Sequence, residues 1–113
     1  MYTRFEFGGT GIFHSLDVIE DMIKTRADEE DLEWAQREFD EYLTVPNLPI
    51  GYRTESYFTE KGLAEFKEPL DIIINMYYQA EDIGFGELTV VESDLNGREV
   101  IYQDEHQIIV AVS

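Results

Sequence analysis

The feature that most constrains the fold is a row of apolar residues at helical spacing in residues 28–43. Leu32, Ala35 and Phe39 recur at steps of three and four, and Tyr42 and Leu43 complete the row. This spacing places the side chains on one face of an α-helix, and that face needs a core to pack against. The other faces carry one basic and eight acidic residues, namely Arg37 with Asp28, Glu29, Glu30, Asp31, Glu33, Glu38, Asp40 and Glu41. We therefore predict an amphipathic helix whose exposed side is strongly acidic.

The charge density of this predicted helix is unusual. Eight acidic residues against one basic residue give residues 28–43 a net charge of −7. At a rise of about 1.5 Å per residue the helix is about 24 Å long, with one net negative charge per roughly 3.4 Å. One strand of B-DNA also carries one charge per about 3.4 Å of axis. The match raises the hypothesis that this helix imitates the charge of DNA.

The whole chain is acidic, with 8 basic and 25 acidic residues and a net charge of −17. Residues 1–56 hold 13 acidic and 5 basic residues, and residues 57–113 hold 12 and 3, so the excess is not confined to a tail. Such a surface repels nucleic acid and anionic lipid, and it attracts basic proteins and cations. Hydrophobic residues make up 43% of the chain and aromatic residues 13%. We therefore expect residues 1–113 to fold as a single domain with its own core.

The chain contains no cysteine, which excludes disulfides, thiolate metal sites and cysteine nucleophiles. Arg4 and Glu6 interrupt the first residues, so no basic-then-apolar signal peptide is recognisable there. The longest apolar stretch, around Ile72 to Tyr78, is too short to cross a bilayer. A cytoplasmic protein is the expectation.

Three further helices are predicted around the acidic one. Ser15 is positioned to cap a first helix with Leu16, Ile19, Met22 and Ile23 on its buried face, and Asp28 to cap the acidic helix. Thr59 is positioned to cap a short helix over Glu60 to Phe66, which Gly62 weakens. Pro69 suits the first position of a helix that runs to about Asp82 and is the most buried.

The strands are predicted mainly in the last third of the chain. Alternating segments at 88–92 and 99–102 and an apolar segment at 107–112, with Asn96-Gly97 as a hairpin turn, indicate a three-stranded antiparallel meander. Tyr2 to Phe7 reads as another strand that could join it, and Ile50 to Phe58 is open between strand and loop. The predicted fold is α+β, with three to four helices packed on one face of a small antiparallel sheet.

The motifs that suggest chemistry have simpler explanations. Gly8 to Gly11 lacks the spacing of a phosphate-binding loop and reads as a tight turn. Residues 92–97 resemble the opening of a calcium loop, but Gln103 stands where a bidentate glutamate is needed. His14 and His106, the two histidines, lie in no zinc-binding or triad pattern. We expect no enzymatic activity, no cofactor and no metal site, although weak divalent-cation binding stays open.

Aromatic residues outside the predicted core point instead to a protein interface. Trp34 lies off the apolar row among charged residues, and a core this small does not need all of Tyr52, Tyr57, Phe58, Tyr78 and Phe85. Aromatic anchors surrounded by charge are typical of interfaces, although Trp34 could equally cover the edge of the core. The predicted partner-binding residues are Glu29, Glu30, Glu33, Trp34, Arg37, Asp40 and Glu41.

In composition, though in no motif, the chain resembles the small acidic proteins that phages and mobile elements use against bacterial nucleases. The resemblance implies a DNA mimic that occupies the basic surface of a nucleic-acid-processing enzyme, or an immunity protein that neutralises a basic toxin. The alternative is an accessory protein-interaction domain that could dimerise through an edge of the meander and whose acidity serves only solubility. That alternative predicts evenly scattered carboxylates and an apolar patch elsewhere. A small enzyme is the third class, and a deep pocket lined by His14 or His106 would favour it.

Overall fold

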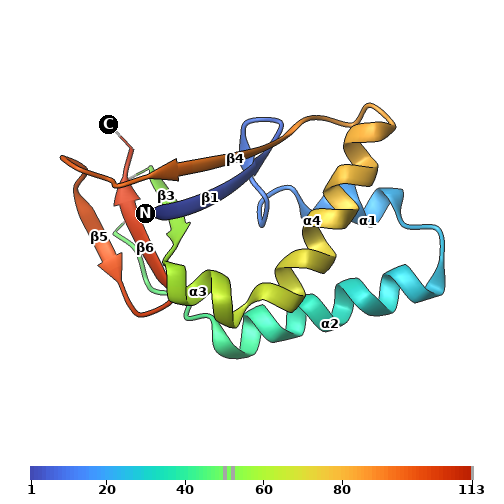
Figure 1. Ribbon diagram of the computed structural model, residues 1–113, viewed down its shortest axis with the longest axis horizontal. Coiled ribbons are helices and arrows are strands. Elements are labelled where there is room, and N and C mark those ends of the chain that lie inside the picture. Colours follow the sequence, from blue (N-terminus) through green and yellow to red (C-terminus); the bar gives the residue numbers. More distant parts are fainter. Residues whose placement is uncertain (50, 52, 113) are drawn as a thin grey trace.

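The computed structural model describes residues 1–49, 51 and 53–112, and in them the chain forms four helices and six strands (Figure 1). The elements in chain order are β1 (Tyr2–Phe7), β2 (Thr10–Gly11), α1 (Leu16–Met22), α2 (Arg26–Tyr42), β3 (Thr54–Phe58), α3 (Glu60–Glu65), α4 (Lys67–Asp82), β4 (Leu88–Ser93), β5 (Val100–Gln103) and β6 (Gln107–Ala111). The predicted α+β class is confirmed. Each helix in the described ranges is too short or too polar to cross a membrane.

The six strands form one antiparallel sheet around β1. Strand β4 pairs with β1 along its whole length, from Tyr2 opposite Ser93 to Phe7 opposite Leu88. Strands β2 and β3 pair with the other edge of β1, and β6 and then β5 continue the sheet beyond β3. The predicted addition of the N-terminal strand is therefore confirmed.

The predicted meander is wrong in one respect, because β4 pairs with β1 and not with β5. Strands β5 and β6 do form the expected antiparallel pair. Asn96-Gly97 does lie in a turn, with Leu95 at φ 56° and Gly97 at φ 79°, and the Arg98 N–H donates to the Leu95 carbonyl oxygen. This turn carries the chain from one edge of the sheet to the other. The alternation of apolar residues marks a strand but does not specify its neighbour.

The open question about residues 50–58 is answered in part. Residues 54–58 form β3, which lies inside the sheet between β1 and β6. Ile50 and Tyr52 lie outside the described residues. The expected tight turn in the Gly8 to Gly11 segment is made by Gly8 and Gly9, both at positive φ, while Thr10 and Gly11 form β2.

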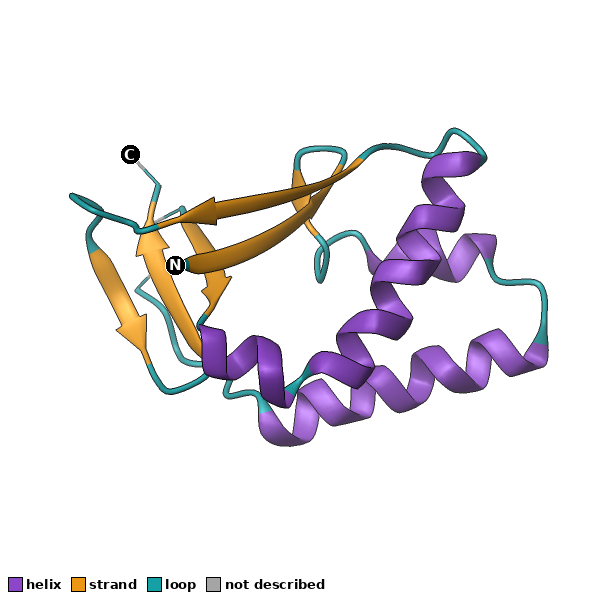
Figure 2. Cartoon of the chain, viewed as in Figure 1, coloured by secondary structure: helices purple, strands orange, loops and turns teal. Residues whose placement is uncertain are grey.

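The helices pack on one face of the curled sheet, as Figure 2 shows. The main core lies between them, and α4 contributes most to it, with Leu70, Ile73 and Tyr77 almost fully buried. The Tyr77 hydroxyl donates to the backbone carbonyl of Ile12, and burial raises the pKa of this phenol. A smaller cluster on the opposite face joins Tyr57, Leu95, Ile108 and Val110. Both faces of the central strands are therefore covered.

The helix boundaries differ from the predicted ones mainly at α2. This helix begins at Arg26, and the Thr25 hydroxyl accepts the Asp28 N–H at 3.2 Å, so the prediction of Asp28 as the cap is wrong. Thr25 offers the same type of acceptor three residues earlier. Ser15 occupies the N-cap position of α1, but its hydroxyl bonds to the Gly11 carbonyl instead. The predicted Thr59 cap of α3 is confirmed, with the Gly62 N–H at 2.9 Å.

Candidate functional site

The negative charge of the protein is concentrated on its helices. The four helices hold seventeen acidic and four basic residues, a net charge of −13. The six strands hold three acidic residues and one basic residue, a net charge of −2. Helix α2 alone carries eight acidic and two basic residues, a net charge of −6. The helices, which lie on one face of the sheet, therefore carry most of the net charge.

The predicted binding residues other than Trp34 form one exposed surface, which we call the α2 acidic face (Glu29, Glu30, Glu33, Arg37, Asp40 and Glu41). At about 100° per residue they span roughly 120° of the helix circumference. The buried residues Leu32, Ala35 and Phe39 lie on the opposite side. Helical period and burial therefore bring these residues together. Arg26, which was not among the predicted residues, lies on the same face by this spacing.

Most carboxylates of α2 have no nearby cation. Glu30 accepts from Arg26 at 3.1 Å, while the other seven have no ion-pair partner within 4.0 Å among the described residues. The acidic residues of β1 and β3 differ. Glu6 lies 2.8 Å from Arg4, and Glu55 lies 3.0 Å from Arg98. The charge of the sheet is thus largely neutralised internally, whereas that of α2 is left to solvent or to a partner.

The aromatic predictions have mixed outcomes. Trp34 is half-buried and packs against the main core, as the alternative interpretation expected. Tyr57 and Phe58 are buried, because β3 is covered on both faces, so these two residues belong to the core. Tyr78 and Phe85 are exposed as expected. A binding role for Trp34 stays a prediction.

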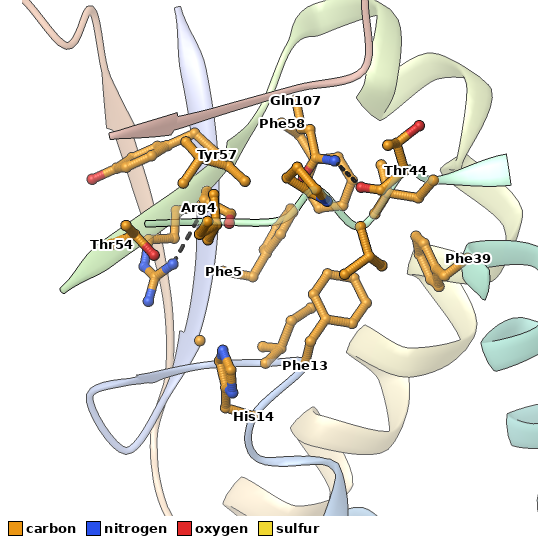
Figure 3. A pocket seen from close by; sticks show the side chains of 18 of the residues that line it. Arg4, Phe5, Phe13, His14, Phe39, Thr44, Thr54, Tyr57, Phe58 and Gln107 are labelled. Atoms are coloured by element: carbon orange, nitrogen blue, oxygen red, sulfur yellow. Dashed lines mark hydrogen bonds between the residues drawn. The ribbon is translucent and has the colours of Figure 1, made fainter. Parts of the chain in front are cut away.

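A groove beside the C-terminal end of α2 was not predicted (Figure 3). It has a volume of about 510 Å³, and we call it the α2–β3 groove. Five segments line it, which are β1, β2 with the turn that leads to the start of α1, the end of α2 with the following loop, β3 and β6. Apolar side chains form most of its wall, including Phe13, Phe39, Leu43, Val45, Leu48, Phe58 and Ile109. No periodicity could indicate this groove, because its segments are far apart in the sequence.

The polar groups around the groove largely satisfy one another. The Gln107 amide donates to the Thr44 carbonyl oxygen, which ties the loop after α2 to β6. Arg4 donates to the Ser56 carbonyl oxygen at 3.2 Å and also pairs with Glu6 and Glu55. Asp40, at the end of α2, is exposed at the groove and belongs to the α2 acidic face.

His14, which the enzyme hypothesis singled out, also lines the groove. A nucleophile and the base that activates it lie within about 2.6–3.2 Å of each other. Within the described part of the chain, no hydrogen bond joins the His14 ring to a carboxylate or a hydroxyl group, and the neighbouring Ser15 hydroxyl bonds to Gly11. The geometry therefore adds no acid–base or nucleophilic pair to the pocket.

A second cluster of polar side chains joins α3 to the β5–β6 connection. The ligand atoms of Glu65, Glu105 and His106 lie within 4.8 Å of one another, a set that could hold a metal ion. The Lys61 ammonium group lies 2.5 Å from Glu105 and 3.6 Å from Glu65. Its hydrogen bond and charge lower the pKa of the Glu105 carboxyl group. Lys61 thus already supplies a positive charge to these carboxylates, and the cluster reads as an ion-pair network.

The segment that resembles a calcium loop uses its polar groups in a turn. The Ser93 hydroxyl accepts the Leu95 N–H at 3.0 Å, and the Asp94 carboxylate accepts the Asn96 N–H at 2.9 Å. These contacts stabilise the turn between β4 and β5 without an ion.

Comparisons with protein-family models, with curated proteins and with solved structures find no match to this chain.

Proposed function

We propose that this protein is a small acidic inhibitor that binds the basic surface of a nucleic-acid-processing enzyme and takes the place of DNA there. Such an inhibitor would suit a phage or mobile element acting against a host nuclease, or an immunity protein acting against a basic toxin. The α2 acidic face is the proposed contact surface. The protein itself acts by binding and not by catalysis.

The observation that carries this proposal is the unneutralised charge of α2. Seven of its eight carboxylates have no ion-pair partner within 4.0 Å among the described residues, on a helix of 17 residues. Evenly scattered carboxylates, expected if acidity served only solubility, would not produce net charges of −13 on the helices and −2 on the strands. A one-sided negative surface can guide a basic partner into a defined orientation.

The test begins with affinity capture from host lysate at about 50 mM salt and elution at about 500 mM salt. A captured nucleic-acid enzyme is then purified, and its nucleic-acid binding and cleavage are measured with increasing amounts of this protein. We expect competitive inhibition whose strength falls steeply as salt rises, because each contact between charges is screened.

Two charge-reversal variants separate site from net charge. Glu29→Lys/Glu33→Lys/Asp40→Lys changes the α2 acidic face, and we expect at least a hundredfold loss of inhibition. Glu87→Lys/Glu92→Lys/Glu99→Lys makes the same change in net charge at exposed positions in and near β4 and β5. The control should inhibit nearly as well as the native chain. Equal inhibition by both triple variants would reject α2 as the contact surface.

A second candidate function is an accessory protein-interaction domain, and the α2–β3 groove is the observation that favours it. Such a domain would bind its partner mainly through apolar contacts. Its affinity should then change little between about 50 mM and 500 mM salt, because apolar burial is not screened by ions. The same salt series therefore separates the two functions.

A further inference from the structure

We propose that the α2–β3 groove receives an apolar side chain from a basic segment of the partner, while the α2 acidic face binds the lysine and arginine residues beside it. This inference rests on the proposed function and specifies the chemistry of the partner. The recognised segment would combine an aromatic or branched aliphatic residue with flanking cations.

The groove and the α2 acidic face are continuous. Asp40 belongs to both, while its neighbour Phe39 is buried in the groove wall. A partner chain lying along α2 therefore meets carboxylates first and the apolar opening at the end of the helix. A cation held by Asp40 places the next side chain of the partner at the groove.

Apolar side chains are exposed at this opening. Phe13 is 38% exposed, Leu48 37% and Val45 85%, and all three line the groove. The Phe13 ring lies edge-on to Phe39 with centroids 4.9 Å apart. A volume of about 510 Å³ is within the range of pockets that enclose small ligands. One aromatic side chain would remove much of this exposed apolar surface from water.

The charge around the groove favours a basic occupant. Among the described residues that line the groove, Arg4 is the one lysine or arginine, and its guanidinium group is already paired with Glu6 and Glu55. Asp40 has no ion-pair partner among the described residues. The opening is therefore negative, which favours a basic segment over an acidic one. A second copy of this chain, with a net charge of −17, matches that requirement poorly.

The probes are fluorescein-labelled peptides of sequence Lys-Arg-X-Lys-Arg, in which X is Ala, Leu or Phe, with binding followed by fluorescence anisotropy. At about 150 mM salt we expect Phe or Leu at X to bind about tenfold more tightly than Ala, since a buried apolar side chain contributes at least that much. All three peptides should weaken as salt rises.

The groove variant is Val45→Glu/Leu48→Glu, and the matched control is Ile83→Glu/Phe85→Glu, which adds the same charge at exposed apolar residues after α4. We expect the preference for Phe over Ala to disappear in the first variant and to persist in the second. Circular dichroism and thermal melting establish that both variants fold.

The results that would contradict the groove proposal can be told apart from those that would contradict the proposed function. Salt-dependent binding without any dependence on X would overturn the groove proposal and leave the proposed function standing. A preference for Phe that survives in the groove variant would also overturn it, because the side chain must then bind elsewhere. A native dimer that this variant dissociates would assign the groove to a second copy. Failure of every peptide to bind at about 50 mM salt would count against the electrostatic basis of the proposed function itself.

Discussion

Gly62 is the residue at which helix α3 touches the connection between β5 and β6. A Cβ atom there would overlap the carbonyl oxygen of His106 and lie 3.0 Å from its carbonyl carbon. This backbone cannot move away easily, because the His106 carbonyl accepts the Thr59 N–H at 3.0 Å and the Glu105 carbonyl accepts the Thr59 hydroxyl at 2.6 Å. The glycine that weakens α3 as a helix thus permits this close approach to the His106 backbone.

Gly62→Ala should therefore destabilise the protein. In an unobstructed helix the change would stabilise by about 0.5–1 kcal/mol, but overpacking against a fixed backbone costs about 1–3 kcal/mol. We expect a net loss of about 1 kcal/mol in the free energy of unfolding, measured by urea denaturation. Glu60→Ala, at an exposed position of the same helix, is the control. Greater stability of Gly62→Ala would show that α3 can move away from His106.

At the scale of the element, α2 depends on a cap that lies before its acidic first turn. Thr25→Ala removes the acceptor for the Asp28 N–H and should cost about 1 kcal/mol of unfolding free energy. Thr25→Ser keeps the hydroxyl group and should retain most of the stability. Urea denaturation followed by circular dichroism measures both variants. Equal stability of the two would mean that Asp28 or another group caps α2 in solution.

The helices and strands were more predictable from the sequence than the pairing of the strands. The spacing of Leu32, Ala35 and Phe39 predicts α2, and the alternation at 88–92 predicts β4. The neighbour of β4 was not predictable, because β1 lies more than eighty residues away and the period of a strand is the same beside any partner. The acidic face was predictable since charged residues stay exposed on the side opposite the core. The α2–β3 groove was not predictable, since segments that range from residue 4 to residue 109 combine to form it.

At the scale of the whole molecule, the uneven charge should limit stability. The protein has a net charge of −17, of which −13 lies on the helices, and its acidic side chains repel one another across the folded surface. The screening length falls from about 30 Å at 0.01 M salt to about 3 Å at 1 M. We therefore expect sodium chloride to raise the melting temperature by about 5 °C over this range, as a gain of about 1 kcal/mol would in a domain of this size.

The two triple charge-reversal variants test where the repulsion is located, because both have the same net charge of −11. If repulsion is greatest on α2, Glu29→Lys/Glu33→Lys/Asp40→Lys removes more of it than Glu87→Lys/Glu92→Lys/Glu99→Lys does. The α2 triple should then show the smaller rise in melting temperature with sodium chloride, and the higher melting temperature at about 0.01 M salt. Identical salt dependence in both would mean that only the total charge matters. In that case the repulsion among the carboxylates of α2 would be no stronger than the repulsion elsewhere on the surface. A basic partner that binds α2 would then relieve no more repulsion than one that binds another part of the surface.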